Sequence, residues 1–355
     1  MVFRIIPFGL IWLFSGWLFL AIEFTAVEQT DEWASTAIRM DLQIFVVASL
    51  AITIVGLILG FFEVRYVDKL FARQSFSRRL LYKVIFYAAC FSLIILIMYP
   101  LAASLELHTG FFDKRVWDKY TDFLSSKTHI STMLQMSASQ FLALFYSEIS
   151  ESMGPRVLMN FFTGKYHQPV EEERVFMFLD MRASTTIAEQ LGHKAYFSLL
   201  RAFYADLSPA IIDHAGEIYQ YAGDEVIISW PLGTGTNRAN CVKAFFTMRS
   251  GLARRKTWYL RRFGVFPEFK AGLHCGLVTT GEIGVVKKEI FFTSDVLNAT
   301  SRIQGLCNNY NVDILISADL IAKIPLPEAW HAISLGVTNL RGKTEDMELF
   351  TVTEA

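Results

Sequence analysis

Three long apolar runs near the start of the chain constrain its fold more than any other feature. They cover residues 5–22, 42–62 and 84–103 and contain no Asp, Glu, Lys or Arg. Each approaches the roughly 20 residues that a helix needs to cross a bilayer. The first run lacks a clear small-residue cleavage site, so we interpret it as a retained span rather than a signal peptide. The sequence therefore predicts an N-terminal all-α transmembrane domain.

The charges between the runs predict their orientation. Residues 23–41 carry mainly Asp and Glu, whereas residues 63–83 are rich in Lys and Arg. Loops rich in Lys and Arg stay on the cytoplasmic side. The N-terminus and residues 63–83 are therefore expected inside, and residues 23–41 outside. The formal net charge of the whole chain is −1, so no global field indicates a nucleic-acid partner.

The remaining half has the pattern of a soluble domain in which strands and helices alternate. We expect strands near 174–180, 216–221, 225–230, 268–276, 278–285, 312–316 and 346–353. We expect helices near 184–213, 237–262 and 294–307. This order predicts an α+β domain whose sheet is covered by helices on one face.

Two aspartates stand at the ends of expected strands. Asp180 closes an apolar run, and Asp224 follows Gly223 between two β-rich runs, as in a hairpin turn. If those strands are neighbours, both carboxylates emerge at one edge of the sheet, where they can hold two divalent cations. The alternative interpretation is structural, with Asp180 as a helix N-cap and Asp224 as a turn former.

Five blocks in this half resemble the catalytic domain of class III nucleotide cyclases, the adenylate and guanylate cyclase family. The resemblance runs from about Glu172 to Val352, and the blocks occur in the family's order and spacing. They are Phe178–Thr186, Gln220–Glu225, Ala271–Gly284, Asp295–Ile303 and Leu340–Lys343. The resemblance implies a ferredoxin-like, palm-type α+β fold.

The resemblance also implies roles for individual residues. Asp180 and Asp224 match the two metal-binding aspartates, which hold Mg²⁺ or Mn²⁺. Asn298 and Arg302 match the asparagine that orients the ribose and the arginine that stabilises the pentavalent phosphate. The residues matched to substrate binding are Met181, Ser184 and Thr185 after the first aspartate, and Lys343 for the terminal phosphates.

The chain departs from the family at the two positions that select the base. Gln220 stands where a Lys (adenylate) or Glu (guanylate) is usual, and Phe291 stands where Asp or Thr is common in adenylate cyclases. A glutamine amide both donates and accepts hydrogen bonds, whereas a phenylalanine can only stack. Adenine is the expectation that the family supplies, and guanine or a pyrimidine stays open.

The family builds each active site between two catalytic domains, with the aspartates from one and Asn and Arg from the other. This chain carries both sets, which implies a homodimer with two equivalent sites. The implied reaction is the conversion of ATP to 3′,5′-cyclic AMP and pyrophosphate. The alternatives are a guanylate or pyrimidine nucleotide cyclase, a silent membrane sensor with a nucleotide-binding cyclase-like domain, and a diguanylate cyclase, which would leave residues 295–303 unexplained.

Three spans from a cytoplasmic N-terminus would leave a cyclase domain outside the cell, away from nucleoside triphosphates. Residues 129–147 contain no Asp, Glu, Lys or Arg but many Ser, Thr and Gln, which suit packed membrane helices. We interpret them as a fourth span; an amphipathic surface helix is the alternative. The predicted organisation is a transmembrane domain over 1–147, a coupling helix or a plain stalk over 148–168, and a catalytic domain over 169–355, multi-pass in the plasma membrane with both termini cytoplasmic.

Overall fold

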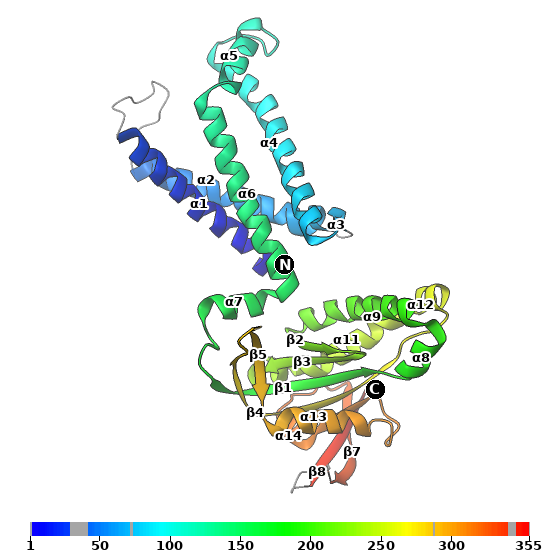
Figure 1. Ribbon diagram of the computed structural model, residues 1–355. Helices are drawn as coiled ribbons and strands as arrows, with labels where there is room; N and C mark the ends of the chain where they lie inside the picture. The colour runs from blue at the N-terminus through cyan, green and yellow to red at the C-terminus, as the bar shows by residue number, and fades with distance from the viewer. Residues whose placement is uncertain (1, 29–41, 72–73, 287, 340–345, 355) are drawn as a thin grey trace. The chain divides into compact units, whose positions relative to one another are not determined.

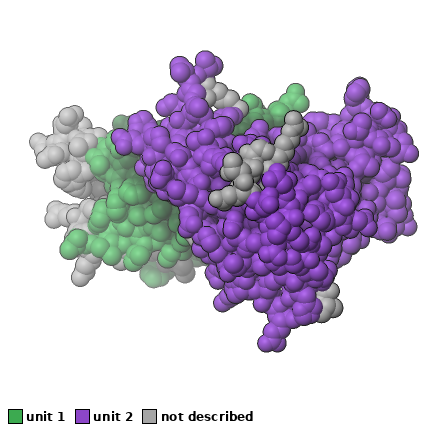
Figure 2. Space-filling view, turned by 90° about the horizontal axis from the view of Figure 1, so that it is seen from below, with its two compact units in different colours: residues 1–162 green, residues 163–355 purple. Residues whose placement is uncertain are grey.

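A computed structural model describes residues 2–28, 42–71, 74–286, 288–339 and 346–354 of the chain (Figure 1). The chain divides into two compact units, residues 1–162 and 163–355 (Figure 2). The described residues of the first unit form helices, and the second unit is built on a mixed sheet. The predicted organisation, a helical N-terminal domain followed by an α+β domain, is thereby confirmed.

The first unit contains three helices that are long and apolar enough to cross a membrane, over Arg4–Ile22, Ser49–Phe71 and Phe76–Leu101. They correspond to the three predicted runs. The described elements of this unit are α1 (Val2–Glu28), α2 (Leu42–Phe62), the π-helical turn η1 (Glu63–Val67), α3 (Asp68–Phe71), α4 (Phe76–Glu106), α5 (Lys114–Leu124), α6 (Lys127–Met153) and α7 (Pro155–Thr163).

Helix α6 contains the predicted fourth span, but its composition is less apolar than that of the other three. It packs against α1 and α4. Its polar residues point into the unit: Gln140 accepts a hydrogen bond from the Trp12 indole at 3.2 Å, and Ser139 accepts one from Ser15 at 2.7 Å. Two of the polar side chains that lower the hydropathy of α6 therefore bond to α1.

Helices α1 and α2 approach closely because glycines stand at their contact. A Cβ atom on Gly56 would lie 2.9 Å from the backbone oxygen of Phe8, and one on Gly60 would lie 2.8 Å from the Phe8 side chain. Small residues four apart are a common device for bringing membrane helices together. Any larger side chain at Gly56 would force the two backbones apart.

A largely buried network of charges joins α1, η1, α3, α4 and α6. The Lys83 ammonium is fully buried and lies 2.5 Å from Glu63, 2.9 Å from Asp68 and 2.6 Å from Glu148. Arg79 binds Asp68, Glu148 and Glu151, and Glu151 also pairs with Arg4. Tyr87 donates a hydrogen bond to Glu63 at 2.9 Å. The π-helical turn begins at Glu63, where the chain changes its pitch at the network.

Three of these carboxylates, Glu63, Asp68 and Glu148, have oxygens close enough together to hold a metal ion. The Lys83 ammonium contacts all three. Arg79 binds two of them as well, so we interpret the cluster as an ion-pair network built around Lys83 and Arg79, and not as a metal site.

Replacing Lys83 with Met is expected to destabilise this unit strongly. The substitution leaves the buried Glu63 carboxylate without its cation, which typically costs about 3–5 kcal/mol. The measurement is denaturant unfolding in detergent, followed by helical circular dichroism. Lys69→Met is the matched control because Lys69 is exposed. Equal stability of the two variants would contradict the role assigned to the network.

The second unit is organised around an eight-stranded sheet with the order β2-β3-β1-β4-β6-β8-β7, in which β5 also pairs with β4. The β4–β6 pair is parallel and the other pairs are antiparallel. The strands are β1 (Val170–Met181), β2 (Glu217–Ala222), β3 (Glu225–Pro231), β4 (Phe269–Ile283), β5 (Glu289–Thr293), β6 (Ile314–Ser317), β7 (Trp330–Thr338) and β8 (Met347–Glu354).

Helices cover both faces of this sheet, whereas we predicted one face. Val175, Met177 and Leu179 of β1 pack in the main core with residues of α9 and α11. Phe176 and Phe178 point the other way and pack with a residue of α13. The helices of the unit are α8 (Ser184–Leu191), α9 (His193–Asp213), α10 (Leu232–Thr236), the 3₁₀ turn η2 (Asn237–Ala239), α11 (Asn240–Arg254), α12 (Lys256–Phe263), α13 (Asp295–Leu306) and α14 (Ala318–Ile321).

Several predicted boundaries were wrong. The strands expected over 268–276 and 278–285 form the single strand β4. Gly276 makes no turn there; a Cβ at this position would lie 2.6 Å from Val296, so the glycine makes room for α13. The helix expected over 184–213 is broken at Gly192, which has φ +70°. Strands β5 and β7 were not predicted.

Candidate active site

The sheet brings Asp180 and Asp224 together as the sequence predicted. Strand β1 pairs with β3, so Asp180 lies opposite Glu225, the residue after Asp224. Gly223 adopts φ +67° in the turn between β2 and β3, a conformation that glycine reaches without steric cost. The Asp180 and Asp224 carboxyls lie within hydrogen-bonding reach of each other.

Helix α9 holds the turn that carries Asp224. The Tyr204 hydroxyl donates to the backbone oxygen of Gly223 at 2.8 Å, and its ring lies against Tyr221 with centroids 4.5 Å apart. Burial and the nearby Asp224 charge raise the pKa of Tyr204, so the hydroxyl remains a donor at neutral pH. The contacts of Tyr204 thus hold the turn from the face of the sheet that α9 covers.

Burial, followed by the charge of its neighbour, disfavours ionisation of Asp180. Burial and then the neighbouring Asp224 raise the pKa of Asp180 to about 6, and Lys270 and Gln304 partly oppose that rise. The pKa of Glu225 is also raised, by burial and by the two aspartates. Carboxylates crowded in this way are disfavoured in the ionised form unless cations join them.

The residues present fit divalent cations. Asp180 and Asp224 offer four carboxylate oxygens at the end of neighbouring strands, with Glu225 beside them. Oxygen donors of this kind suit Mg²⁺ and Mn²⁺, and positive charge would relieve the repulsion between the two groups.

The chain reverses direction directly after Asp180. Ala183 adopts the left-handed conformation with φ +52°, and α8 begins at Ser184. Ser184 is hydrogen-bonded with Tyr196 of α9, and Thr185 is exposed. Met181 is 1% exposed and its side chain belongs to the main core, so it would have to meet a substrate through its backbone.

Helix α13 has two faces with different partners. Asn298 is exposed and Arg302 is half-buried, whereas Thr300 and Gln304 lie in the buried stripe. The Arg302 Nη1 atom is buried and has no hydrogen-bond partner within the described part of the chain. Residues 302 and 304 are separated by about 200° around a helix. Because Gln304 reaches Asp180, Arg302 points elsewhere.

The two residues expected to select the base are both exposed, Gln220 on β2 and Phe291 on β5. Their chain neighbours Tyr219 and Phe292 pack edge to face with ring centroids 4.8 Å apart. The two strands thus bring the predicted base-reading positions into one region. Lys343 lies outside the described residues.

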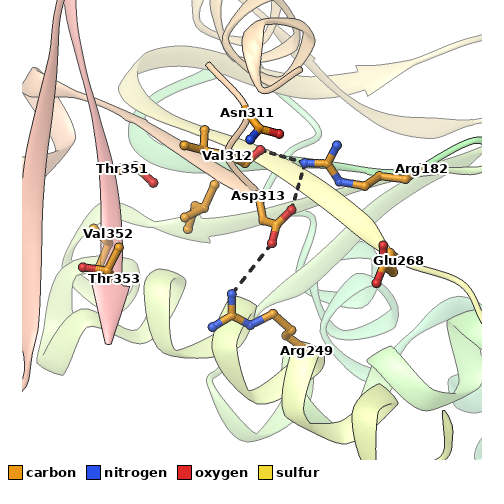
Figure 3. Close-up of a pocket in the computed structure, with 10 residues that line it drawn as sticks. Arg182, Arg249, Glu268, Asn311, Val312, Asp313, Thr351, Val352 and Thr353 are labelled. Carbon is orange, nitrogen blue, oxygen red and sulfur yellow. Dashed lines mark hydrogen bonds and ion pairs between the residues drawn. The ribbon is translucent and has the colours of Figure 1, made fainter. Parts of the chain in front are cut away.

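A cleft of about 510 Å³ lies nearby, and none of the predicted site residues lines it (Figure 3). Arg182 enters it from the turn after Asp180 and donates to the Val312 oxygen and to Asp313, at 2.8 Å each. Arg249 approaches Asp313 from the other side at 3.9 Å. Because Arg182 and Arg249 both pair with Asp313, neither guanidinium in this cleft is free to bind an anion.

Sequence reasoning missed the groups that surround Asp180. Lys270 lies opposite Asp180 on β4, with its ammonium 3.6 Å from Oδ2. Gln304 donates a hydrogen bond to the same oxygen at 3.2 Å. These contacts depend on the register of β1 against β4 and on the packing of α13 against the sheet. No sequence motif indicates either of them.

Comparisons with known proteins agree with this geometry. No family model matches the chain. Adenylate cyclase 2 of Rhizobium meliloti (strain 1021) is 31% identical over 210 residues, which cover 59% of this chain and 58% of that protein. The adenylate cyclase of Anabaena cylindrica is 25% identical over 183 residues, covering 50% and 36% respectively.

Among solved structures, a bacterial light-regulated adenylyl cyclase matches with a TM-score of 0.53 at 21% identity, over 64% of each chain. At this identity the match shows a shared fold. The chain spans less than two thirds of the length of each of these relatives.

Replacing Asp180 with Asn is expected to stabilise the metal-free protein at pH 7.5. The raised pKa means that ionisation of Asp180 opposes folding, so stability falls as pH rises from its ordinary pKa of 3.8 towards about 6. A shift of this size corresponds to roughly 1–3 kcal/mol. Thermal unfolding with chelator present should show the gain at pH 7.5 and little of it at pH 4. Glu171→Gln, at an exposed position, is the control, and a variant less stable than wild type at pH 7.5 would contradict the repulsion.

Proposed function

We propose that the chain is a class III nucleotide cyclase, specifically a membrane-bound adenylate cyclase that converts ATP to 3′,5′-cyclic AMP and pyrophosphate. The observation that carries the proposal is the pairing of Asp180 and Asp224 at adjoining strand ends. The names of the relatives, adenylate cyclases in each case, support the choice of ATP.

The reaction is an in-line attack of the ribose 3′-hydroxyl on the α-phosphate, with pyrophosphate as the leaving group. Asp180 and Asp224 would hold two divalent cations, which supply Lewis-acid stabilisation of the attacking oxygen and of the phosphates. Asn298 orients the ribose. Arg302 stabilises the negative charge that gathers on the phosphate in the transition state. Its unpaired, buried Nη1 supports this role, because a guanidinium without a partner is ready to bind an anion.

The proposed active site is shared between two copies of the chain. Asn298, which is exposed, and Arg302, which is half-buried, lie on the side of α13 opposite the buried stripe that contains Gln304. This arrangement supports a homodimer in which α13 of one chain serves the aspartates of the other. Ser184, Thr185 and Lys343 are assigned to the phosphates, and Met181 is assigned to substrate through its backbone.

Base selection is assigned to Gln220 and Phe291. Both side chains are exposed, so both are accessible to a base. A guanylate or pyrimidine nucleotide cyclase is the second candidate, because this pair differs from the family's usual adenine-reading residues.

Purified protein supplied with each of the four nucleoside triphosphates, with Mn²⁺ or Mg²⁺, is expected to yield mainly cyclic AMP. The measurement is identification of the cyclic products by mass. Asp224→Ala should abolish turnover, because it removes a carboxylate from the metal site. A different cyclic nucleotide would redirect the base assignment, and no product from any triphosphate would favour a silent nucleotide-binding sensor.

The shared site predicts rescue between two inactive variants. Neither Asp224→Ala nor Arg302→Ala should work as a homodimer. In a heterodimer of the two, one site collects both lesions and the other has none, so activity should return to at most about half per heterodimer. The measurement is turnover after subunit exchange, with wild-type mixtures as the control. No rescue in mixtures that exchange subunits would place each site within one chain.

We further propose four spans with both termini in the cytoplasm. The polar residues of α6 bond to α1, while Ile130, Leu134 and Leu142 are exposed on its outer side. A helix that is polar inside and apolar outside suits a packed membrane span.

A reporter enzyme that works only in the cytoplasm is therefore expected to be active when it is fused after Ala355. The loop charges described above give the physical reason, because Lys and Arg hold residues 63–83 inside. The opposite control is a reporter that works only outside the cell, inserted between residues 28 and 42, where it should be active. Exchange of these two results would overturn the topology.

A further inference from the structure

Two side chains outside the family's motif roles hold one oxygen of Asp180. Gln304 donates to Oδ2 at 3.2 Å from α13, and the Lys270 ammonium lies 3.6 Å from the same atom on β4. Gln304 is 6% exposed and Lys270 9%. Both contacts therefore stand in a partly dry environment, where a hydrogen bond to a charged group is stronger than in water.

The backbone fixes Gln304 in this position. A Cβ atom on Gly272 would lie 2.3 Å from the backbone nitrogen of Gln304, so α13 rests directly on β4. Gly272 is two residues from Lys270 and faces the same side of the sheet. Lys270 in turn is the direct cross-strand partner of Asp180. Glycine on β4 thus lets α13 descend far enough for its amide to reach the carboxylate.

The other groups near Asp180 all come from the opposite direction. Asp224 and Glu225 belong to the β2–β3 turn and the start of β3, and Tyr196 and Tyr204 belong to α9. With Oδ2 held by Gln304 and Lys270, the orientation of the Asp180 carboxylate is restrained from the side of α13 and β4. Mutation of an outer group that orients a metal-binding carboxylate typically costs about 10–100-fold in metal affinity.

We propose that Gln304, assisted by Lys270, is a positioning residue that orients the Asp180 carboxylate for divalent cations. This inference rests on the proposed function, because it takes Asp180 as a metal ligand. It adds that α13 serves two sites at once. Its exposed side carries Asn298 and Arg302 for the partner chain, and its buried stripe steadies the aspartate of its own chain.

The test is Mn²⁺ binding to the full-length protein without nucleotide, measured by the paramagnetic resonance of free Mn²⁺. Gln304→Met keeps the length of the side chain and removes the donor, and it should weaken Mn²⁺ binding about 10–100-fold. Gln190→Met is the matched control, the same substitution at an exposed glutamine on α8. Asp180→Ala should abolish binding at this site.

Activity supplies a second readout that a general folding defect would not give. Raising Mn²⁺ should restore the kcat of Gln304→Met to near the wild-type value, because the lesion affects metal binding only. Thermal unfolding of the single and double variants forms a double-mutant cycle. Gln304→Met should lower Tm in the wild-type background. It should change Tm little in Asp180→Ala, because the hydrogen-bond acceptor is already absent there.

The outcomes separate the two proposals. If Asp180→Ala loses Mn²⁺ while Gln304→Met binds it as tightly as Gln190→Met, the positioning role is wrong and the metal site stands. If Asp180→Ala binds Mn²⁺ like wild type, both proposals fail. Equal Tm losses from Gln304→Met in the two backgrounds would also refute a contact between Gln304 and Asp180.

Discussion

Two carboxylates held within reach of each other are the constraint on which the second unit depends. Asp180 and Asp224 repel, and burial makes the repulsion worse. The sheet nevertheless holds them together, because β1 is fixed on both sides, against β3 and against β4. Holding the two carboxylates together lowers the folding stability at this end of the strands. Divalent cations bound there would relieve the repulsion.

The first unit treats buried charge in the opposite way. Around Lys83 each buried carboxylate contacts a cation, so the network ties η1, α3, α4 and α6 together. Around Asp180 the carboxylates outnumber Lys270, so the site retains unsatisfied negative charge. A network whose charges are paired stabilises helix packing, whereas a cluster with excess negative charge favours the binding of cations. The same residue types thus serve assembly in one unit and chemistry in the other.

Much of this could be predicted from the sequence because the signals are local. Apolar runs of span length predict the membrane helices, and a glycine before Asp224 predicts its turn. Contacts that depend on register or on the seating of a helix could not be predicted. The pairing of Asp180 with Lys270 needs the alignment of β1 and β4. The position of Gln304 needs α13 to rest on Gly272, and Gly276, which resembles a strand break in the sequence, makes room for the same helix.

The bonds between α6 and α1 have a consequence for how the chain enters a bilayer. In the proposed four-span arrangement, α6 is too polar to partition into lipid by itself, and Gln140 and Ser139 find their partners only on α1. The last span must therefore insert as a companion of the first, after Trp12 and Ser15 are in place. Insertion would then have a fixed order, and in that arrangement a chain whose early helices fail to insert would also leave its second unit on the wrong side of the bilayer.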